Sequence, residues 1–221
     1  MRGPCPLLPD TPPARQGASA RPWSYDFSYT RDPTDALDWI IDNKRRQYRR
    51  TGQHDIFCCG WTARLLRRLT EEANEDFGPR FSVMRIDGEI VSAVMSLTAG
   101  DRSHLWFPAY NHAYARYGPG MLNTMKMLEA AAAEGCRAFD FGPGEEPYKA
   151  YFCNPAKPVA EGRLVANPWR TSISRTLAGS MGGRLRRRLH VVSACETSLA
   201  GWTRGLATVA RAAAGLSYRA A

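Results

Sequence analysis

The chain has 221 residues, of which 44% are hydrophobic and 23% charged, a composition typical of a soluble globular protein. No apolar run reaches the roughly 18–20 residues that a membrane-spanning helix needs, and the proline-rich residues 1–20 lack the apolar core of a secretory signal peptide. We therefore expect a cytoplasmic protein. The formal net charge of +9 belongs to residues 162–221, which hold ten arginines and one acidic residue, so the neutral body gives no reason to expect nucleic-acid binding.

The first part of the chain predicts disorder followed by two helices. Residues 1–25 are rich in Pro, Gly, Ser, Ala and Arg, show no periodicity and are predicted to be disordered. Asp32-Pro33-Thr34 is typical of a helix start, and apolar residues follow at helical spacing to about residue 50. A second helix is expected over 61–74, with Gly78-Pro79 ending it.

The middle of the chain predicts an antiparallel meander. Alternating residues over 81–86, the turn Asp87-Gly88, and the apolar run 90–97 are typical of a β-hairpin, and 104–110 is a third strand. A helix over 119–134 and a short strand over 137–141 follow. A strand, a helix and then a strand predict a crossover and parallel pairing of the two strands.

The last part of the chain predicts a short helix over 147–153 and a final strand at Arg163-Leu164-Val165. From Pro168 onward the pattern is helical and basic. We therefore expect a disordered segment over 1–25, an α/β (α+β) domain over 33–166 and a basic helical extension over 167–221.

The cysteines predict reduced thiols and no metal site. No two of them have C-x-x-C spacing, and the adjacent pair Cys58-Cys59 is a poor chelate with no histidines at the usual spacing.

One candidate binding site is the segment from Arg116 to Leu122, between the third strand and the long helix. Glycines let the backbone approach a ligand closely, proline fixes the helix start, and free N–H groups there favour phosphate. The candidate ligand-binding residues are Arg116, Tyr117, Gly118, Gly120, Met121 and Leu122. The alternative is an ordinary tight turn.

A second candidate site follows the strand that ends at Asp140. This strand end leads into a glycine-rich loop, a usual place for catalytic groups. Asp140 and Tyr148 are candidates for proton transfer, and Glu145 and Lys149 for substrate binding. The alternative is that Asp140 bonds the loop backbone while the charged residues are solvated.

Two further features have open interpretations. The aromatic strand with Trp106 and Tyr110 either lines a substrate cleft or belongs to the core. The cluster Arg184, Arg186, Arg187 and Arg188 either contacts an anionic membrane surface or is a solvated helix face. No aromatic residues interleave the cluster, which argues against RNA.

These motifs together resemble the BioF2-like, CelD-type branch of the GNAT acetyltransferases. The resemblance covers about residues 33–166 and rests on the following segments: Ala36-Leu37-Asp38-Trp39, Lys44-Arg45-Arg46-Gln47-Tyr48, Phe81-Ser82-Val83-Met84-Arg85, Ala109-Tyr110, Arg116-Tyr117-Gly118-Pro119-Gly120, and Phe139-Asp140-Phe141-Gly142-Pro143-Gly144 with Tyr148-Lys149. It implies a GNAT fold, a central mixed sheet flanked by helices.

The resemblance also implies an activity, namely acyl transfer from acetyl-CoA or another acyl-CoA to an amine or hydroxyl of a small-molecule or saccharide acceptor. It implies a role in polysaccharide or envelope synthesis. By position it implies that residues 116–122 bind the pyrophosphate, that Tyr148 is a general acid, and that Asp140 is a base or substrate anchor. No metal is implied.

Two departures from the family pattern leave alternatives open. Pro119 interrupts the usual Gly-x-Gly signature, and members of this branch usually have a related half before this segment. A truncated form would dimerise or need a partner half. An aminoacyl-tRNA donor, as in the related Fem transferases, and a catalytically inactive adaptor held at the membrane are the other candidate functions.

Overall fold

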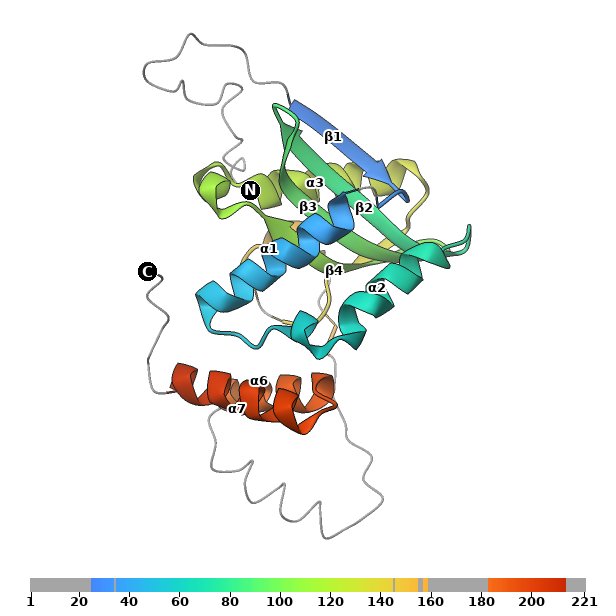
Figure 1. The fold of residues 1–221 in the computed structure, drawn as a ribbon. Coiled ribbons are helices and arrows are strands. Elements are labelled where there is room, and N and C mark those ends of the chain that lie inside the picture. Colours follow the sequence, from blue (N-terminus) through green and yellow to red (C-terminus); the bar gives the residue numbers. More distant parts are fainter. Residues whose placement is uncertain (1–24, 34, 145, 155–156, 159–182, 214–221) are drawn as a thin grey trace. The chain divides into compact units, whose positions relative to one another are not determined.

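The computed structural model describes residues 25–33, 35–144, 146–154, 157–158 and 183–213 (Figure 1). They belong to two compact units, one comprising Met1–Asn43 and Arg68–Phe152, the other Lys44–Arg67 and Cys153–Ala221. No helix of the described residues is long and apolar enough to cross a membrane.

The first unit is built on a five-stranded mixed sheet with the order β1-β2-β3-β4-β5. The strands are β1 (Tyr25–Thr30), β2 (Phe77–Ile86), β3 (Glu89–Ala99), β4 (Arg102–Tyr110) and β5 (Ala138–Asp140). The first four pair antiparallel, and β4 pairs parallel with β5. The predicted meander and the predicted parallel crossover are confirmed.

Local sequence explains the β2–β3 hairpin. Asp87 and Gly88 both have positive φ angles, 50° and 81°, as a two-residue turn matched to the twist of the strands requires. The strands beside it are almost continuously buried, and their core includes Phe81, Met84 and Val94.

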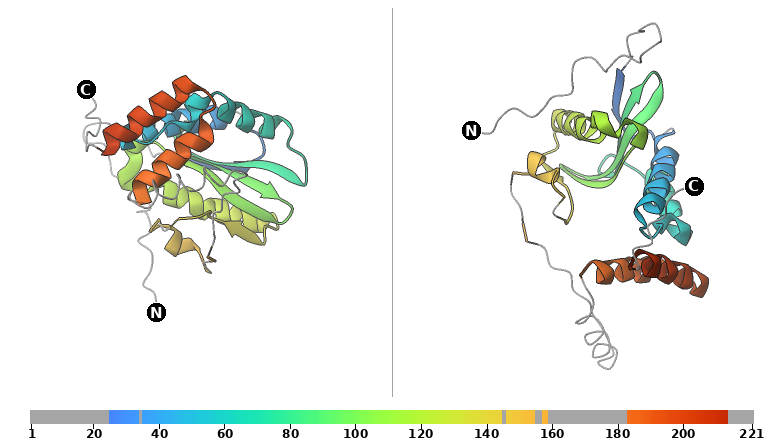
Figure 2. Two further views of the ribbon diagram at one scale, coloured as in Figure 1. Left: turned by 90° about the horizontal axis from the view of Figure 1, so that it is seen from below. Right: turned by 90° about the vertical axis from the view of Figure 1, so that its left-hand side faces the viewer.

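Helix α3 (Pro119–Ala133) lies along one face of this sheet and contacts β1 to β4 (Figure 2). Met127 of this helix is fully buried. A buried polar group also joins the layers, because the Asn123 amide donates to the Ser82 carbonyl (3.2 Å) and to the Ser92 hydroxyl (3.1 Å). Ser92 in turn donates to the carbonyl of Ala109 (3.2 Å).

Helix α1 (Ala36–Thr51) begins in the first unit and continues in the second. Its residues 36–43 lie on the face of the sheet opposite α3 (Figure 2) and bury Leu37 and Ile40. Asp35, just before the helix, pairs with Arg85 of β2 at 2.7 Å.

The second unit contains the rest of α1, the 3-10 helix η1 (Ile56–Cys59), most of α2 (Trp61–Glu71), and the helices α6 (Gly183–Cys195) and α7 (Leu199–Ala213). A Cβ atom on Gly205 would lie 2.4 Å from a Val192 methyl group, so glycine allows α6 and α7 to approach closely. These two helices confirm the helical pattern predicted after Pro168, within the described residues.

The structure differs from the sequence-based predictions at Gly78-Pro79 and at β1. Gly78-Pro79 does not end α2, which stops at Glu71; both residues lie in β2, outside the stretch 81–86 that pairs with β1, where an edge position tolerates proline. Strand β1 was not predicted. The strand predicted at 163–165 lies outside the described residues.

Candidate active site

The outer side of β4 is paired only near its start. Strand β5 pairs only with Arg102, Ser103 and His104, and no other described strand lies beside residues 105–110 on that side. A bulge in the pairing of β4 with β3 lies in this stretch, because Met95 pairs with Phe107 and Ser96 with Leu105, which leaves Trp106 as the extra residue. Backbone groups on this edge are available to an extended ligand.

The start of α3 lies just beyond the end of β4. Helix η2 (His112–Tyr117) leads into Gly118, whose left-handed conformation (φ 62°, ψ 38°) begins α3. The Gly118 carbonyl accepts hydrogen bonds from Met121 (3.0 Å) and Leu122 (3.2 Å). Since proline has no N–H, the Gly120 N–H is the donor at this helix start that has no partner among the described residues.

Tyr110 brings the end of β4 against this helix start. A Cβ atom on Gly120 would lie 3.4 Å from Cδ1 of the Tyr110 ring, so the ring covers the glycine. Arg116 is exposed, and its guanidinium stacks over the Tyr117 ring at 4.6 Å. The predicted ligand-binding segment therefore offers one free N–H and one exposed cation, while the N–H groups of Met121 and Leu122 are already bonded.

At the other end of the open edge, Asp140 pairs with a histidine. Its Oδ1 accepts a hydrogen bond from the Gly142 N–H (2.7 Å), and its Oδ2 lies 3.5 Å from Nδ1 of His104. His104 and Asp140 are direct neighbours in the parallel ladder. Sequence reasoning selected Asp140 and missed His104, because only the strand register reveals the pair.

Lys149 holds the loop after β5. Its ammonium donates to the carbonyls of Gly142 (3.1 Å) and Pro143 (3.0 Å) and pairs with Glu146 (2.8 Å). Its three N–H donors are thus used within the loop, and its contact with a substrate stays a prediction. Glu145, the other predicted substrate-binding residue of this loop, lies outside the described residues.

Tyr148 is half-buried against the core beside β4. That core cluster contains Val94, Leu105, Met127 and Phe141, and Tyr148 packs against it. The Tyr148 ring meets the Phe141 ring edge-on, with centroids 6.4 Å apart. The strand, the loop and α4 (Lys149–Phe152) therefore bring Tyr148 to the same part of the sheet as Leu105.

The predicted aromatic residues of β4 are both accessible. Tyr110 is 42% exposed. Trp106, at the bulge, is half-buried with its ring 5.1 Å from that of Phe107. In α6, Arg188 is half-buried, and the side chains of Arg184, Arg186 and Arg187 are not among those described.

The chain was compared with known proteins. Residues 13–150 match the family model described as the acetyltransferase (GNAT) domain. No curated protein matches the sequence.

Solved structures give weaker likenesses. A ribosomal-protein-alanine N-acetyltransferase from Brucella melitensis biovar Abortus 2308 is 9% identical (TM-score 0.44), with 65% of this chain and 100% of that chain covered. An aminoglycoside acetyltransferase, HMB0005, from an uncultured soil metagenomic sample is 16% identical (TM-score 0.41), with 65% and 99% covered. A tandem GNAT protein from the clavulanic acid biosynthesis pathway is also 16% identical (TM-score 0.37), with 58% and 42% covered.

With TM-scores below 0.5, these likenesses do not carry the assignment, which rests on the family match. That match spans more than half of the chain, and the five-stranded mixed sheet flanked by helices agrees with the fold expected from the resemblance. The chain belongs to the GNAT acetyltransferase family of enzymes.

Proposed function

We propose that this enzyme transfers an acyl group from acetyl-CoA or another acyl-CoA to an amine or hydroxyl acceptor, and that the donor lies along the open edge of β4. The observation that carries the proposal is the separation of β4 from β5 beside a helix start with a free N–H. From His104 to Tyr110 the edge is about 20 Å long, at about 3.3 Å per residue. This length suits an extended donor with its phosphates at one end and its acyl group toward the other.

The phosphate end is proposed to lie at the start of α3. The Gly120 N–H and the positive end of the helix dipole favour an anion, and Arg116 adds an exposed cation. Backbone groups of β4 would bind the amide-containing arm of the donor, as an added strand binds a sheet edge. An N–H of the same edge would polarise the thioester carbonyl.

The catalytic groups are proposed to lie at the other end. The acceptor attacks the carbonyl carbon directly, so positioning supplies much of the rate. His104, oriented by Asp140, accepts the proton that the acceptor loses. As the carbon–sulfur bond breaks, the Tyr148 hydroxyl donates a proton to the departing thiolate.

For the acceptor, we propose a saccharide or a related envelope precursor, as the BioF2-like, CelD-type resemblance implies. The accessible rings of Trp106 and Tyr110 support this proposal, because flat aromatic faces with polar edges suit sugar rings. Association of α6 with an anionic membrane surface, through Arg184, Arg186, Arg187 and Arg188, stays part of the proposal.

The test is release of free thiol from acetyl-CoA by the purified full chain, with amino sugars, neutral sugars and simple amines as separate acceptors. Acceptor-dependent thiol release that Asp140→Asn and Tyr148→Phe reduce would support the assignment. A chain that binds acetyl-CoA but transfers to none of these acceptors would contradict the proposed acceptor class. Transfer from charged tRNA, with none from acetyl-CoA, would replace the proposed donor by the Fem-like alternative.

A further inference from the structure

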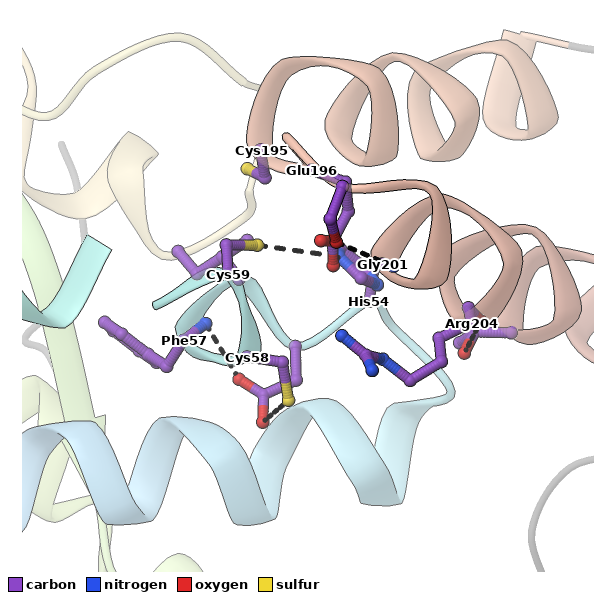
Figure 3. Close-up of polar contacts among 12 residues, drawn as sticks. His54, Phe57, Cys58, Cys59, Cys195, Glu196, Gly201 and Arg204 are labelled. Atoms are coloured by element: carbon purple, nitrogen blue, oxygen red, sulfur yellow. Dashed lines mark hydrogen bonds and ion pairs between the residues drawn. The ribbon is translucent and has the colours of Figure 1, made fainter. Parts of the chain in front are cut away.

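Three potential metal ligands converge within the second unit (Figure 3). His54 precedes η1, Cys59 ends it, and Glu196 follows α6. Nε2 of His54 lies 2.9 Å from Oε1 of Glu196 and 3.9 Å from Sγ of Cys59. The three ligand atoms all lie within 4.8 Å of one another.

One oxygen of the buried Glu196 carboxylate, Oε1, has no hydrogen-bond donor among the described residues. Its side chain is 2% exposed and that of His54 is 6% exposed. Oε1 lies 2.9 Å from Nε2 of His54 but accepts no hydrogen bond from any described residue. A buried carboxylate oxygen without a donor is costly, which suggests that another group satisfies it.

The surrounding residues fix these ligands in place. Asp55 caps η1 by accepting from the Phe57 N–H (3.0 Å), and the Trp61 indole donates to the Cys195 carbonyl (2.9 Å). A Cβ atom on Gly201 would lie only 1.8 Å from Oε2 of Glu196, so the carboxylate occupies space that only glycine leaves. The segment around η1, the connection between α6 and α7, and the first turn of α7 therefore hold the cluster.

A nucleophilic thiol does not explain the cluster. In a Cys–His–acid relay, the acid and the thiol bond opposite ring nitrogens, whereas Glu196 and Cys59 both approach Nε2 of His54. Ligand atoms that converge on one point are instead typical of a cation site.

We propose that His54, Cys59 and Glu196 bind a Zn²⁺ ion. Imidazole, thiolate and carboxylate are the ligands that zinc takes in proteins, and tetrahedral zinc sets such atoms about 3.3–3.8 Å apart, so the observed separations need only small side-chain shifts. The ion would supply the partner that Oε1 lacks and would link residues 54–59 to the α6–α7 connection. This site departs from the sequence-based expectation of no metal, and it is independent of acyl transfer.

Cys58 provides a matched control within the same chain. Its thiol donates to Oδ2 of Asp55 (3.3 Å), a carboxylate that also pairs with Arg45 (3.0 Å), so the adjacent thiols have different partners. Only Cys59 belongs to the cluster.

The experiment uses the full chain, reduced and stripped of metal by a chelator, and titrates it with Co²⁺ and then Zn²⁺. We expect one equivalent of Co²⁺, with thiolate-to-cobalt charge transfer and the intense visible bands of tetrahedral coordination, displaced by one equivalent of Zn²⁺. Zn²⁺ should also protect Cys59, but not Cys58, from alkylation, as read by peptide mass spectrometry. No stoichiometric binding by the folded, reduced chain would overturn the proposal. A Cys59–Cys195 disulfide in the purified chain, followed by no metal binding once it is reduced, would also overturn it.

Variants give a second comparison. Cys59→Ser and Glu196→Gln should weaken Zn²⁺ binding by more than about 100-fold, since even outer-shell partners contribute about 10- to 100-fold. Cys58→Ser should leave the affinity unchanged. Equal losses in Cys58→Ser and Cys59→Ser would contradict the assignment, and protection of Cys59 in the wild-type chain decides the matter if a variant does not fold.

Discussion

Asp140 and His104 face each other across the parallel ladder of β5 and β4, with Oδ2 of the acid 3.5 Å from Nδ1 of the imidazole. They lie where the two strands begin to separate. The acid is also fixed by the Gly142 N–H, so one oxygen holds the loop and the other faces the histidine.

Asp140→Asn should preserve the loop but weaken catalysis. The amide oxygen can still accept from the Gly142 N–H, whereas the negative charge beside His104 is lost. We expect the rate of acyl transfer to fall by about 10²-fold or more, the usual contribution of a positioned acid–base group. Steady-state thiol release measures it. His104→Gln should show a similar loss, and a near-normal rate in both variants would remove the pair from the mechanism.

Tyr148→Phe tests the proposed general acid. The phenylalanine ring can keep the edge-on contact with Phe141, so folding should be unchanged and only the hydroxyl lost. We expect kcat to fall by about 10²-fold with little change in KM for the donor. Tyr151→Phe, at a 70% exposed position in α4, the helix that follows Tyr148, is the control and should have wild-type kinetics. An unchanged kcat in Tyr148→Phe would show that water or another group protonates the thiolate.

Asn123→Leu tests the buried polar group between α3 and the sheet. Asn123, Ser82 and Ser92 are fully buried, and leucine would leave the Ser82 and Ser92 groups without their amide partner. We expect the free energy of unfolding to fall by about 2–4 kcal/mol, the effect of several unsatisfied buried groups. Urea unfolding measures it. A loss below about 0.5 kcal/mol, the usual range for surface substitutions, would mean that the group contributes little.

Lys44→Met tests a buried ammonium. Burial lowers the pKa of Lys44 from 10.5 to about 8. Between these two values the unfolded chain binds more protons than the native one, so the contribution of this group to the free energy of unfolding rises with pH. The penalty is full below about pH 8 and vanishes above about pH 10.5. Lys44→Met should therefore stabilise the protein at pH 7, by about 1–3 kcal/mol.

In Lys44→Met, the free energy of unfolding should lack this rise between pH 8 and 10. Urea unfolding at several pH values measures the difference from wild type, which cancels the titration of other groups. Lys126→Met, at an exposed position, is the control and should follow the wild-type pH dependence. Parallel curves for wild type and Lys44→Met would contradict the lowered pKa.

The sequence predicted most elements of the first unit because their causes are local. The alternation in residues 81–86, the Asp87-Gly88 turn and the proline at the start of α3 each determine structure within a few residues. Strand β1 could not be predicted because its place depends on pairing with β2, about 50 to 60 residues away. Gly78-Pro79 was wrongly predicted to end α2 for the same reason, because β2 tolerates a proline only where β1 no longer pairs with it.

The sites show the same limit more sharply. Asp140 could be selected from its position after a strand, but its partner His104 could be found only from the register of two strands joined through α3. His54 and Cys59 are separated from Glu196 by more than a hundred residues, and no local spacing predicts that the three residues lie together. The free N–H of Gly120 followed from the local sequence, whereas the hydrogen bonds of Met121 and Leu122 to Gly118 did not.

The measurement that tests the central claim most directly is calorimetric titration of the folded full chain with acetyl-CoA, comparing wild type with Gly120→Trp and Gly120→Ala. The alanine Cβ would lie 3.4 Å from the Tyr110 ring and fits, whereas an indole would cover the Gly120 N–H. We predict saturable, one-to-one binding to wild type and Gly120→Ala, and none to Gly120→Trp. No binding by the folded wild type, or equal binding by Gly120→Trp, would contradict a donor site at the start of α3.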